Sequence, residues 1–381
     1  MTEKQPLSNV LRNRRRVSGF SLIETMVGLA LGLVVVLAIV QVWGAFEGQK
    51  QRTISGATAQ ESGLLALTEI EQDVRSAGAG VTNSALECTS IYSHYESGGT
   101  EVSPVPAYSG SNPVAPIRIV DGGSGSDAIT VKRGSDIVGG MPVTLDADMS
   151  SSSAEINVPS VAGFSNGDVA MVMNSSGQCT VLLITAVQNA ALKIQHNPGA
   201  TTTYNPSVSF KNANGWPTYS AGSKIMKVGA LETRTYSVTS NNRLALLDAT
   251  NPVAPAVSDL AHDIVKFKAQ YGIADPLSQD VNAWVNASAA TGWDAPDTAK
   301  IKRIKAIRIV VIARSAKLEG TNVTGTCVNN AGTNNGPCAW TDTAAHPAPL
   351  IDLSADPDWR RYRYRVYQTI IPLRNVIWAG L

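Results

Sequence analysis

The chain has 381 residues, of which 44% are hydrophobic, so it is long enough for a large core and for more than one domain. Its formal net charge is +1, from 31 Lys and Arg against 30 Asp and Glu. Non-specific nucleic-acid binding relies on clustered cations, and the two dense basic runs, 300–308 and 360–374, lie in alternating sequence that predicts strands. The composition therefore makes a nucleic-acid partner an unfavoured interpretation.

The N-terminal segment combines a basic leader, residues 1–19, with an apolar helix. Thr25 to Phe46 is a run of 22 residues without a charge. A helix of that length spans about 33 Å, which crosses a bilayer core of about 30 Å. Because the leader carries five basic residues and one acidic residue, the positive-inside rule keeps it cytoplasmic and exports the rest of the chain.

Two ordinary explanations of this segment leave features unexplained. A cleaved secretory signal needs small residues after the apolar run, and no convincing site lies near Phe46. A plain membrane anchor gives no reason for Glu24, because a carboxylate at hydrocarbon depth costs on the order of 3 kcal/mol and usually marks a function. The carboxylate therefore points to a role beyond anchoring.

Residues Gly19 to Glu24, Gly-Phe-Ser-Leu-Ile-Glu, resemble the class III signal of type IV prepilins position by position. The resemblance implies that a prepilin peptidase cleaves between Gly19 and Phe20, and that Phe20 becomes the N-methylated first residue. Glu24 is then expected to meet the Phe20 ammonium of a neighbouring subunit during assembly. Because desolvation offsets the attraction of a buried pair, we expect this contact to set register more than stability.

Gly28 and Gly32 form a G-x-x-x-G step on the same helix. Such a step allows two helices to approach closely in lipid or in a filament core. In a helix this rich in glycine the step also arises by chance, so both interpretations stay open.

Residues 47–79 are predicted to continue the helix, after the transmembrane or filament-core part at 20–46, as a water-facing amphipathic segment. Apolar residues recur at three- and four-residue steps among acidic ones, so one stripe is expected to pack against the following domain. Gly78-Ala79-Gly80 is expected to end the helix. The expected stripe consists of Leu64, Leu67, Ile70, Val74 and Ala77, with Asp73 among the polar positions.

Residues 80–381 are predicted to form a β-rich, loop-rich periplasmic or extracellular domain. The expected fold class is therefore α+β: pilin-like, with a long N-terminal membrane-spanning helix packed on a large β-sheet-rich domain. No repeat or clear linker divides this domain, although 139–140 and 197–217 are candidate seams. The predicted strands are 129–132, 154–158, 169–173, 181–187, 192–195, 233–238, 264–271, 304–313 and 362–372, and the predicted loops include 121–127, 149–153 and 320–337.

Two late segments narrow the resemblance. Ile264 to Gly272 is similar to the strand ending in Tyr-Gly of PilW-type minor pilins and of the related J-type pseudopilins, and Trp284, Trp293 and strand 305–315 supply the segments that follow it in that family. The end of the chain, 360–375, resembles the C-terminal strand of PilW proteins, which closes on Arg-Asn. Residues 80–260 match this family only in style.

This resemblance implies a non-enzymatic minor pilin that assembles with other minor pilins and the major pilin to prime and cap a type IV pilus. Its expected partners include the prepilin peptidase, the inner-membrane assembly platform and, as a further candidate, a tip adhesin. The expected location is the bacterial inner membrane, as a single-pass protein with a cytoplasmic N-terminus and a periplasmic body, and then the pilus tip. Two alternatives stay open: a J-type pseudopilin at the tip of a type II secretion pseudopilus, and a tip-located adhesin or DNA-binding module.

The four cysteines, Cys88, Cys179, Cys327 and Cys338, form an even set in an exported domain, where disulfides persist. Three pairings are possible. Pairing Cys327 with Cys338 closes a short loop and needs little ordering of the chain, which favours it and leaves Cys88 with Cys179. Four buried thiols are the alternative, and no C-x-x-C or His-Cys spacing predicts a metal site.

Catalytic motifs are not found in the sequence. His94, His196, His262 and His346 are far apart, and neither H-E-x-x-H nor G-x-S-x-G occurs. Asp352, Asp356 and Asp358 are close enough for a calcium site, but without the spacing of a calcium loop they are better interpreted as turn and cap residues. We therefore expect no enzyme, no cofactor and no metal.

The first prediction concerns processing of the leader. The mature chain is expected to start at methylated Phe20, because Gly19 lies at the cytoplasmic edge of the apolar run. Intact mass spectrometry of membrane material should give residues 20–381 plus one methyl group, and Gly19→Ala should block the cleavage. A chain that keeps the basic leader, or a processed Gly19→Ala variant, would contradict the prediction.

Overall fold

The computed structural model describes residues 19–80, 87–97, 100–102, 115–135, 141–199, 203–251, 254–340 and 346–378. The leader up to residue 18 and the candidate seam at 139–140 lie outside these residues. The chain divides into two compact units, residues 1–54 and 55–381. A single helix, α1 (Leu22–Ser76), begins in the first unit and ends in the second.

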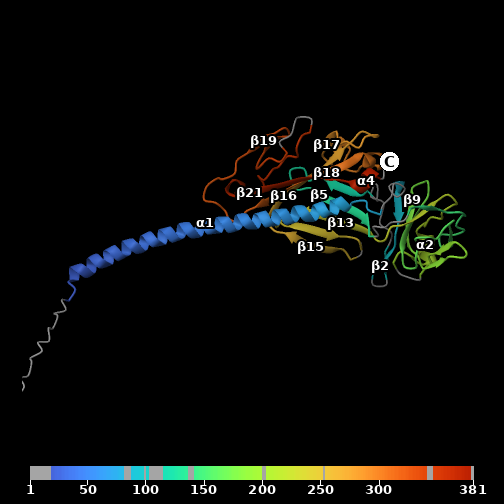
Figure 1. Ribbon diagram of the computed structural model, residues 1–381, viewed down its shortest axis with the longest axis horizontal. Helices are drawn as coiled ribbons and strands as arrows, with labels where there is room; N and C mark the ends of the chain where they lie inside the picture. The colour runs from blue at the N-terminus through green and yellow to red at the C-terminus, as the bar shows by residue number, and fades with distance from the viewer. Residues whose placement is uncertain are drawn as a thin grey trace, which may run out of the picture. The chain divides into compact units, whose positions relative to one another are not determined.

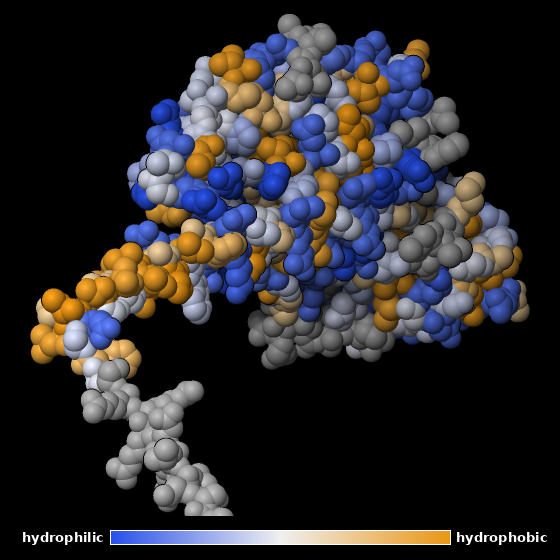
Figure 2. Space-filling model, turned by 60° about the vertical axis from the view of Figure 1, so that its left-hand side comes forward, coloured by the Kyte–Doolittle hydropathy of each residue, from blue (hydrophilic) through white to orange (hydrophobic). Residues whose placement is uncertain are grey.

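The first unit consists of the apolar part of α1. Every residue from Leu22 to Phe46 is exposed, including the large apolar side chains, and Figure 2 shows them as a hydrophobic stretch of helix. This is also the one segment of the described chain that is long and apolar enough to cross a membrane. Because exposed apolar surface of this extent is unfavourable in water, the segment needs lipid or protein around it.

The last turns of α1 belong to the second unit and bury one narrow face. The prediction for this stripe was right for Ile70, Val74 and Ala77, and Leu67 is half-buried, but Leu64 is 47% exposed. The buried face differs from the predicted stripe, because its N-terminal half consists of small residues. Its members are Ala59, Ser62, Gly63, Ala66, Ile70, Asp73 and Val74.

Two antiparallel sheets pack with α1 into the main hydrophobic core (Figure 1). The first sheet has the order β15-β14-β13-β5-β4, and the second has the order β17-β16-β18-β21. The bounds of the first are β4 (Ile117–Val120), β5 (Ala128–Gly134), β13 (Leu231–Val238), β14 (Leu244–Asp248) and β15 (Ala256–Ala261). Those of the second are β16 (Ile264–Ile273), β17 (Ala283–Val285), β18 (Ile304–Arg314) and β21 (Tyr364–Pro372).

The other face of the β16–β18–β21 sheet is covered by the chain between β18 and β21. Val310 and Ile312 pack there against Ile351, Leu353 and other residues of a separate small core. This covering segment contains the hairpin β19 (Cys327–Asn329) and β20 (Gly332–Asn334) and the short helix η3 (Trp359–Arg361). Since both of its faces are covered, β18 is buried along ten of its eleven residues, which explains its apolar run Ile309–Ala313.

Residues 141–228 form an insert between β5 and β13 with its own hydrophobic core. Its larger sheet has the order β1-β9-β8-β12-β6, in which the edge strand β1 comes from the chain before β4, and its smaller sheet has the order β10-β11-β7. The strands are β1 (Ser90–Tyr92), β6 (Val143–Thr144), β7 (Ile156–Asn157), β8 (Val169–Met173), β9 (Gln178–Leu183), β10 (Ala186–Gln188), β11 (Lys193–Gln195) and β12 (Lys224–Lys227). The remaining elements are β2 (Tyr95–Ser97), β3 (Thr100–Val102), α2 (Val208–Ala213), η2 (Ala289–Thr291), α3 (Thr298–Arg303) and α4 (Arg374–Trp378).

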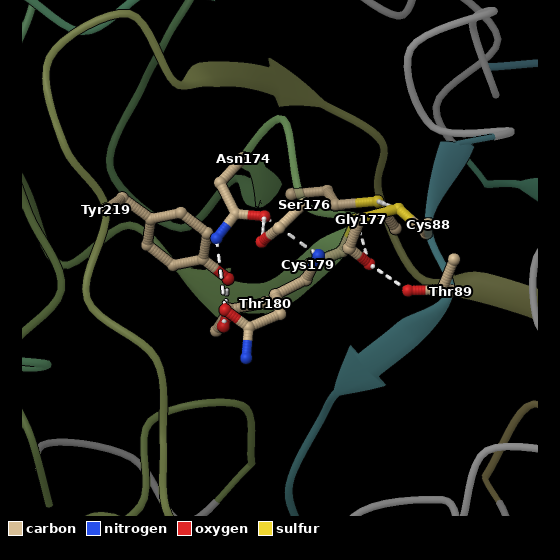
Figure 3. The surroundings of a disulfide bond; sticks show 10 residues. Cys88, Thr89, Asn174, Ser176, Gly177, Cys179, Thr180 and Tyr219 are labelled. Atoms are coloured by element: carbon tan, nitrogen blue, oxygen red, sulfur yellow. Dashed lines mark hydrogen bonds between the residues drawn. A yellow bond between two sulfur atoms is a disulfide. The ribbon is translucent and has the colours of Figure 1, made fainter.

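Two disulfides join Cys88 to Cys179 and Cys327 to Cys338, the pairing that loop length favoured. Cys88 and Cys179 are fully buried, and their bond ties the chain entering β1 to its neighbour β9. Around this bond, shown in Figure 3, the Thr89 hydroxyl donates to the Gly177 carbonyl at 3.1 Å. Tyr219 donates to Thr180 at 2.6 Å on the same strand. The disulfide therefore sits in an ordered hydrogen-bonded corner of the insert.

The predicted strands are correct in place for the long segments and wrong for short or charged ones. Segment 181–187 divides into β9 and β10, and only Ile156–Asn157 of 154–158 is a strand. Residues 298–303 form α3 and not a strand, because the Asp297 carboxylate accepts from the Lys300 amide and so caps a helix. The predicted loop 320–337 contains the β19–β20 hairpin. Among the strands that were not predicted are β14, which is short and mostly apolar, and β15, whose sequence mixes polar and apolar residues.

The disulfides are expected to contribute unequally to stability. The Cys88–Cys179 bond spans 91 residues and the Cys327–Cys338 bond spans 11. Because the entropy removed from the unfolded chain grows with loop length, Cys88→Ala with Cys179→Ala should lower the free energy of unfolding by about 4 kcal/mol, against about 2–3 kcal/mol for the other pair. Urea titration of the full chain in detergent measures both, and equal losses would contradict this ranking.

Candidate assembly site

The start of α1 is closed by a reciprocal pair of hydrogen bonds between Ser21 and Glu24. The Ser21 amide donates to Glu24 Oε2 at 3.0 Å, and the Glu24 amide donates to Ser21 Oγ at 3.3 Å. This is a capping box, in which two amides without helical partners are satisfied at once. An acid in the first turn is also favoured by the helix dipole. Glu24 therefore has a local structural role that the sequence analysis missed, although the S-x-x-E spacing signals it.

The other predicted residues of the signal lie on exposed backbone and helix. Phe20 is 86% exposed, and Gly19 and Phe20 precede the helix. Cβ atoms added at Gly28 or Gly32 would meet nothing within 4 Å. The two glycines lie one turn apart, so the first unit presents a strip where another helix can approach closely.

Asp73 lies near the end of α1 and is 4% exposed. Its carboxylate accepts from the Tyr236 hydroxyl at 2.6 Å and from Arg234 Nη1 at 3.2 and 3.3 Å. It also accepts from Arg133 Nη1 at 3.2 Å. Asp73 was expected among the polar positions of the helix. It lies between Ile70 and Val74 on the buried face, and this spacing could have predicted its burial.

The arginines around Asp73 are themselves held by acids on the sheet. Arg133 Nε donates to Glu232 at 2.6 Å, and Arg234 Nε lies 3.6 Å from Asp248. Burial lowers the pKa of Arg234, but the charge and hydrogen bond of Asp73, together with the charge of Glu232, outweigh burial, and the pKa is raised. Burial and then Asp73 raise the pKa of Tyr236, so its hydroxyl stays protonated as a donor. The last turn of α1 is thus paired to β5 and β13 by charge-assisted hydrogen bonds.

Gly63 allows α1 to approach the second sheet closely. A Cβ atom built at Gly63 would lie 2.1 Å from the Tyr367 ring on β21. No side chain fits that space, so the helix must present glycine at this position. This contact explains why the buried face consists of small residues and why Leu64 points away from it.

The C-terminal Arg-Asn sequence meets the end of the same helix. Asn375 Nδ2 donates to the carbonyl oxygen of Ala77 at 3.0 Å and to that of Ser76 at 3.5 Å. The last carbonyls of a helix have no partner within it. The Ala79 amide donates to the Ser76 carbonyl, and Asn375 satisfies the next one, that of Ala77.

The Tyr-Gly sequence at the end of β16 also has a packing reason. A Cβ atom at Gly272 would lie 2.7 Å from the Trp284 ring, so the ring of β17 needs glycine beneath it. Trp284 in turn covers the Arg308 guanidinium, whose Cζ lies 4.9 Å from the ring centroid. Tyr271 accepts from the Ile119 amide at 2.6 Å and so joins the two sheets.

The histidines and acids of the described segments include a buried histidine and several turn residues. Within the described residues no group of three or more His, Cys, Asp and Glu could hold a metal ion. Burial, with the nearby Lys211 adding to it, lowers the pKa of His196 to about 4, so this histidine is a neutral core residue. Asp352 accepts from Ser354 and Asn335, and Asp356 accepts from the Asp358 amide, as turn residues do.

The basic run at 300–308 is largely used inside the fold, whereas Arg360, Arg363, Arg365 and Arg374 of the second run are exposed. Arg308 is buried and donates to Gln270 at 2.6 Å, Arg303 donates to the Ala274 carbonyl, and Lys305 is 5% exposed. A surface for phosphate backbones needs exposed cations, so the run at 300–308 offers little for nucleic acid.

The exposed apolar helix, the signal before it and the sheet domain that holds its last turns define a type IV prepilin-like protein. Residues 14–40 match the family model of the prokaryotic N-terminal methylation motif. Residues 229–375 match the family model PilW, type IV pilus-assembly protein W. The two matches support a type IV prepilin-like minor pilin that is anchored in the membrane and is similar to PilW over residues 229–375.

The PilW match runs from the turn before β13 into α4, so it includes the Tyr-Gly strand and the Arg-Asn ending. Proteins of this family are structural parts of the pilus. Neither the curated proteins nor the solved structures contain a match to this chain.

A further prediction concerns Asp73. Asp73→Asn keeps the shape of the side chain but removes the anion that Arg133 and Arg234 share, leaving them only Glu232 and Asp248. Because both arginines are partly exposed, the loss should be about 2–3 kcal/mol of unfolding free energy, at or below the usual cost of breaking a buried pair. Glu61→Gln, on an exposed position of the same helix, should change it by less than about 0.5 kcal/mol. Equal unfolding free energies for the two variants would show that Asp73 does not fix the helix.

Proposed function

We propose that this protein is an inner-membrane minor pilin that joins other minor pilins to prime a type IV pilus and then stays at its tip. Cleavage after Gly19 and methylation of Phe20 would release the helix 20–46 for assembly. The N-terminus would start in the cytoplasm and the body, residues 80–381, in the periplasm, as the positive-inside rule requires.

One observation carries the proposal: α1 is a single helix that is exposed and apolar at one end and locked into a sheet domain at the other. The exposed end can exchange lipid for neighbouring helices, since both environments are apolar. The locked end holds the helix through Asp73 and Asn375. A chain built in this way can be pulled from a membrane into a filament without unfolding its body.

Glu24 is proposed to act on a neighbour through its charge. Its carboxylate lies within hydrogen-bonding distance of the Ser21 amide, one residue from the Phe20 amino group that cleavage would create. In an apolar filament core that amino group needs an anion. The same oxygens also serve the capping box, so charge and capping must be separated by experiment.

Two substitutions of Glu24 separate its charge from its capping role. Glu24→Gln keeps an acceptor at the capping-box position but removes the charge, whereas Glu24→Ala removes both. If the charge meets a neighbour's ammonium, both variants should be cleaved and folded yet lower surface piliation by roughly tenfold, the effect of about 1.4 kcal/mol. Electron microscopy of pili, with immunoblots for abundance and cleavage, measures this in cells that lack the native copy.

Glu61→Gln is the matched control, because Glu61 is an exposed acid farther along the same helix. It should leave piliation unchanged. Normal piliation by Glu24→Gln at native abundance would assign the carboxylate to capping alone and contradict its role in assembly. If deletion of the whole protein left pilus number unchanged, the priming function itself would be wrong.

A further inference from the structure

A pocket of about 310 Å³ lies where β18 ends and β21 begins, at one end of the second sheet. It belongs to the described part of the PilW-type region but touches neither the signal nor the Asp73 contacts. Two cations, Lys266 and Arg314, and two acids, Asp352 and Asp356, line it. Such a concentration of charge in a concave site needs an explanation, because none of these groups serves the assembly site.

Arg314 is held by Asp356 and Tyr362, and its Nε donor is unused. Its Nη1 donates to Asp356 Oδ2 at 2.7 Å, and its Cζ lies 4.1 Å from the centroid of the Tyr362 ring. Its Nε is buried and has no hydrogen-bond partner among the described residues. A buried donor without an acceptor costs about 1–3 kcal/mol, so an acceptor entering the pocket would be stabilised there.

Lys266 supplies further donors at the same pocket. It is 7% exposed, and its Nζ donates to the Ser124 carbonyl oxygen at 2.8 Å. An ammonium has three donors, so two remain. Burial lowers the pKa of Lys266, the neighbouring Lys268 lowers it further, and the charges of Asp352 and Asp127 offset only part of this. A ligand anion beside this ammonium would offset more of it.

The acids of the pocket restrict what kind of anion fits. Asp356 already neutralises Arg314, and Oδ1 of Asp352 accepts from Ser354 and Asn335. Because the two acids balance the two cations, a simple anion gains little net attraction. A ligand that carries donors of its own, such as hydroxyl groups or an ammonium, satisfies the acids as well.

We propose that this pocket binds a small carboxylate-bearing molecule that also carries hydroxyl or ammonium donors. The ligand carboxylate accepts from Arg314 Nε and Lys266 Nζ, and its donors face Asp352. An acidic sugar and an amino acid share this chemistry, and the pocket is near the lower end of the usual range for small-ligand sites, about 300–1,000 Å³. This binding is independent of the proposed role in pilus assembly.

Isothermal titration of the full chain in detergent tests the proposal with three probes: glucuronate, glutamate and glucose. Glucose has the ring of glucuronate but no carboxylate. We expect glucuronate or glutamate to bind at least about tenfold more tightly than glucose, because a charge-assisted hydrogen bond contributes about 1.5–3 kcal/mol. Binding of glucuronate alone identifies acidic sugars as the ligand class, and binding of glutamate alone identifies amino acids.

Arg314→Lys keeps the charge beside Asp356 but removes the Nε donor, so it should weaken binding about tenfold. Lys266→Met should weaken it at least as much. Arg365→Lys, an exposed position on β21, is the matched control and should bind as the native chain does. Circular dichroism checks each fold, and Arg314→Lys decides the matter if Lys266→Met does not fold. Failure of both acids to bind more tightly than glucose, or binding that Arg314→Lys leaves unchanged, would overturn the proposal.

Discussion

The rest of the structure depends on one buried carboxylate. The sheet buries Asp73, and burying an anion without partners costs a large free energy. Tyr236, Arg234 and Arg133 supply its hydrogen bonds, and they come from two neighbouring strands. The last turns of α1 can therefore neither rotate nor slide along the sheet without stranding this charge. The close contact of Gly63 with Tyr367 and the hydrogen bonds of Asn375 are compatible with that one rotation of the helix.

This constraint explains why features far apart in the sequence belong together. The Arg-Asn ending is useful because the helix ends beside it, and the Tyr-Gly strand is useful because Tyr271 joins the sheets that hold the helix. Both segments therefore help to hold α1 against the sheets. Most of the residues that hold the last turns of the helix lie in the region that matches PilW.

The insert joins β5 and β13 at a position that leaves the contacts of Asp73 unchanged. Gly134 and Leu231 are paired residues of β5 and β13, so the ends of the intervening segment lie side by side. A segment with adjacent ends and its own core can vary without moving the strands that hold Asp73, and the Cys88–Cys179 bond ties it to the chain before β4. The PilW match begins at residue 229, just after the insert, as this arrangement leads one to expect.

The sequence by itself determined the parts of this protein that depend on local pattern. The signal at Gly19 to Glu24, the long apolar helix, the α+β class and the long buried strands β8, β16 and β18 were all predictable, because charge, length and the period of apolar residues are visible without partners. Only the tertiary structure decided which face of α1 is buried, since Gly63 and Asp73 are explained by Tyr367 and the arginines opposite them. The same holds for the short strands β14 and β15, for Asn375 and for the pocket at Arg314, whose residues come together only when distant strands pair.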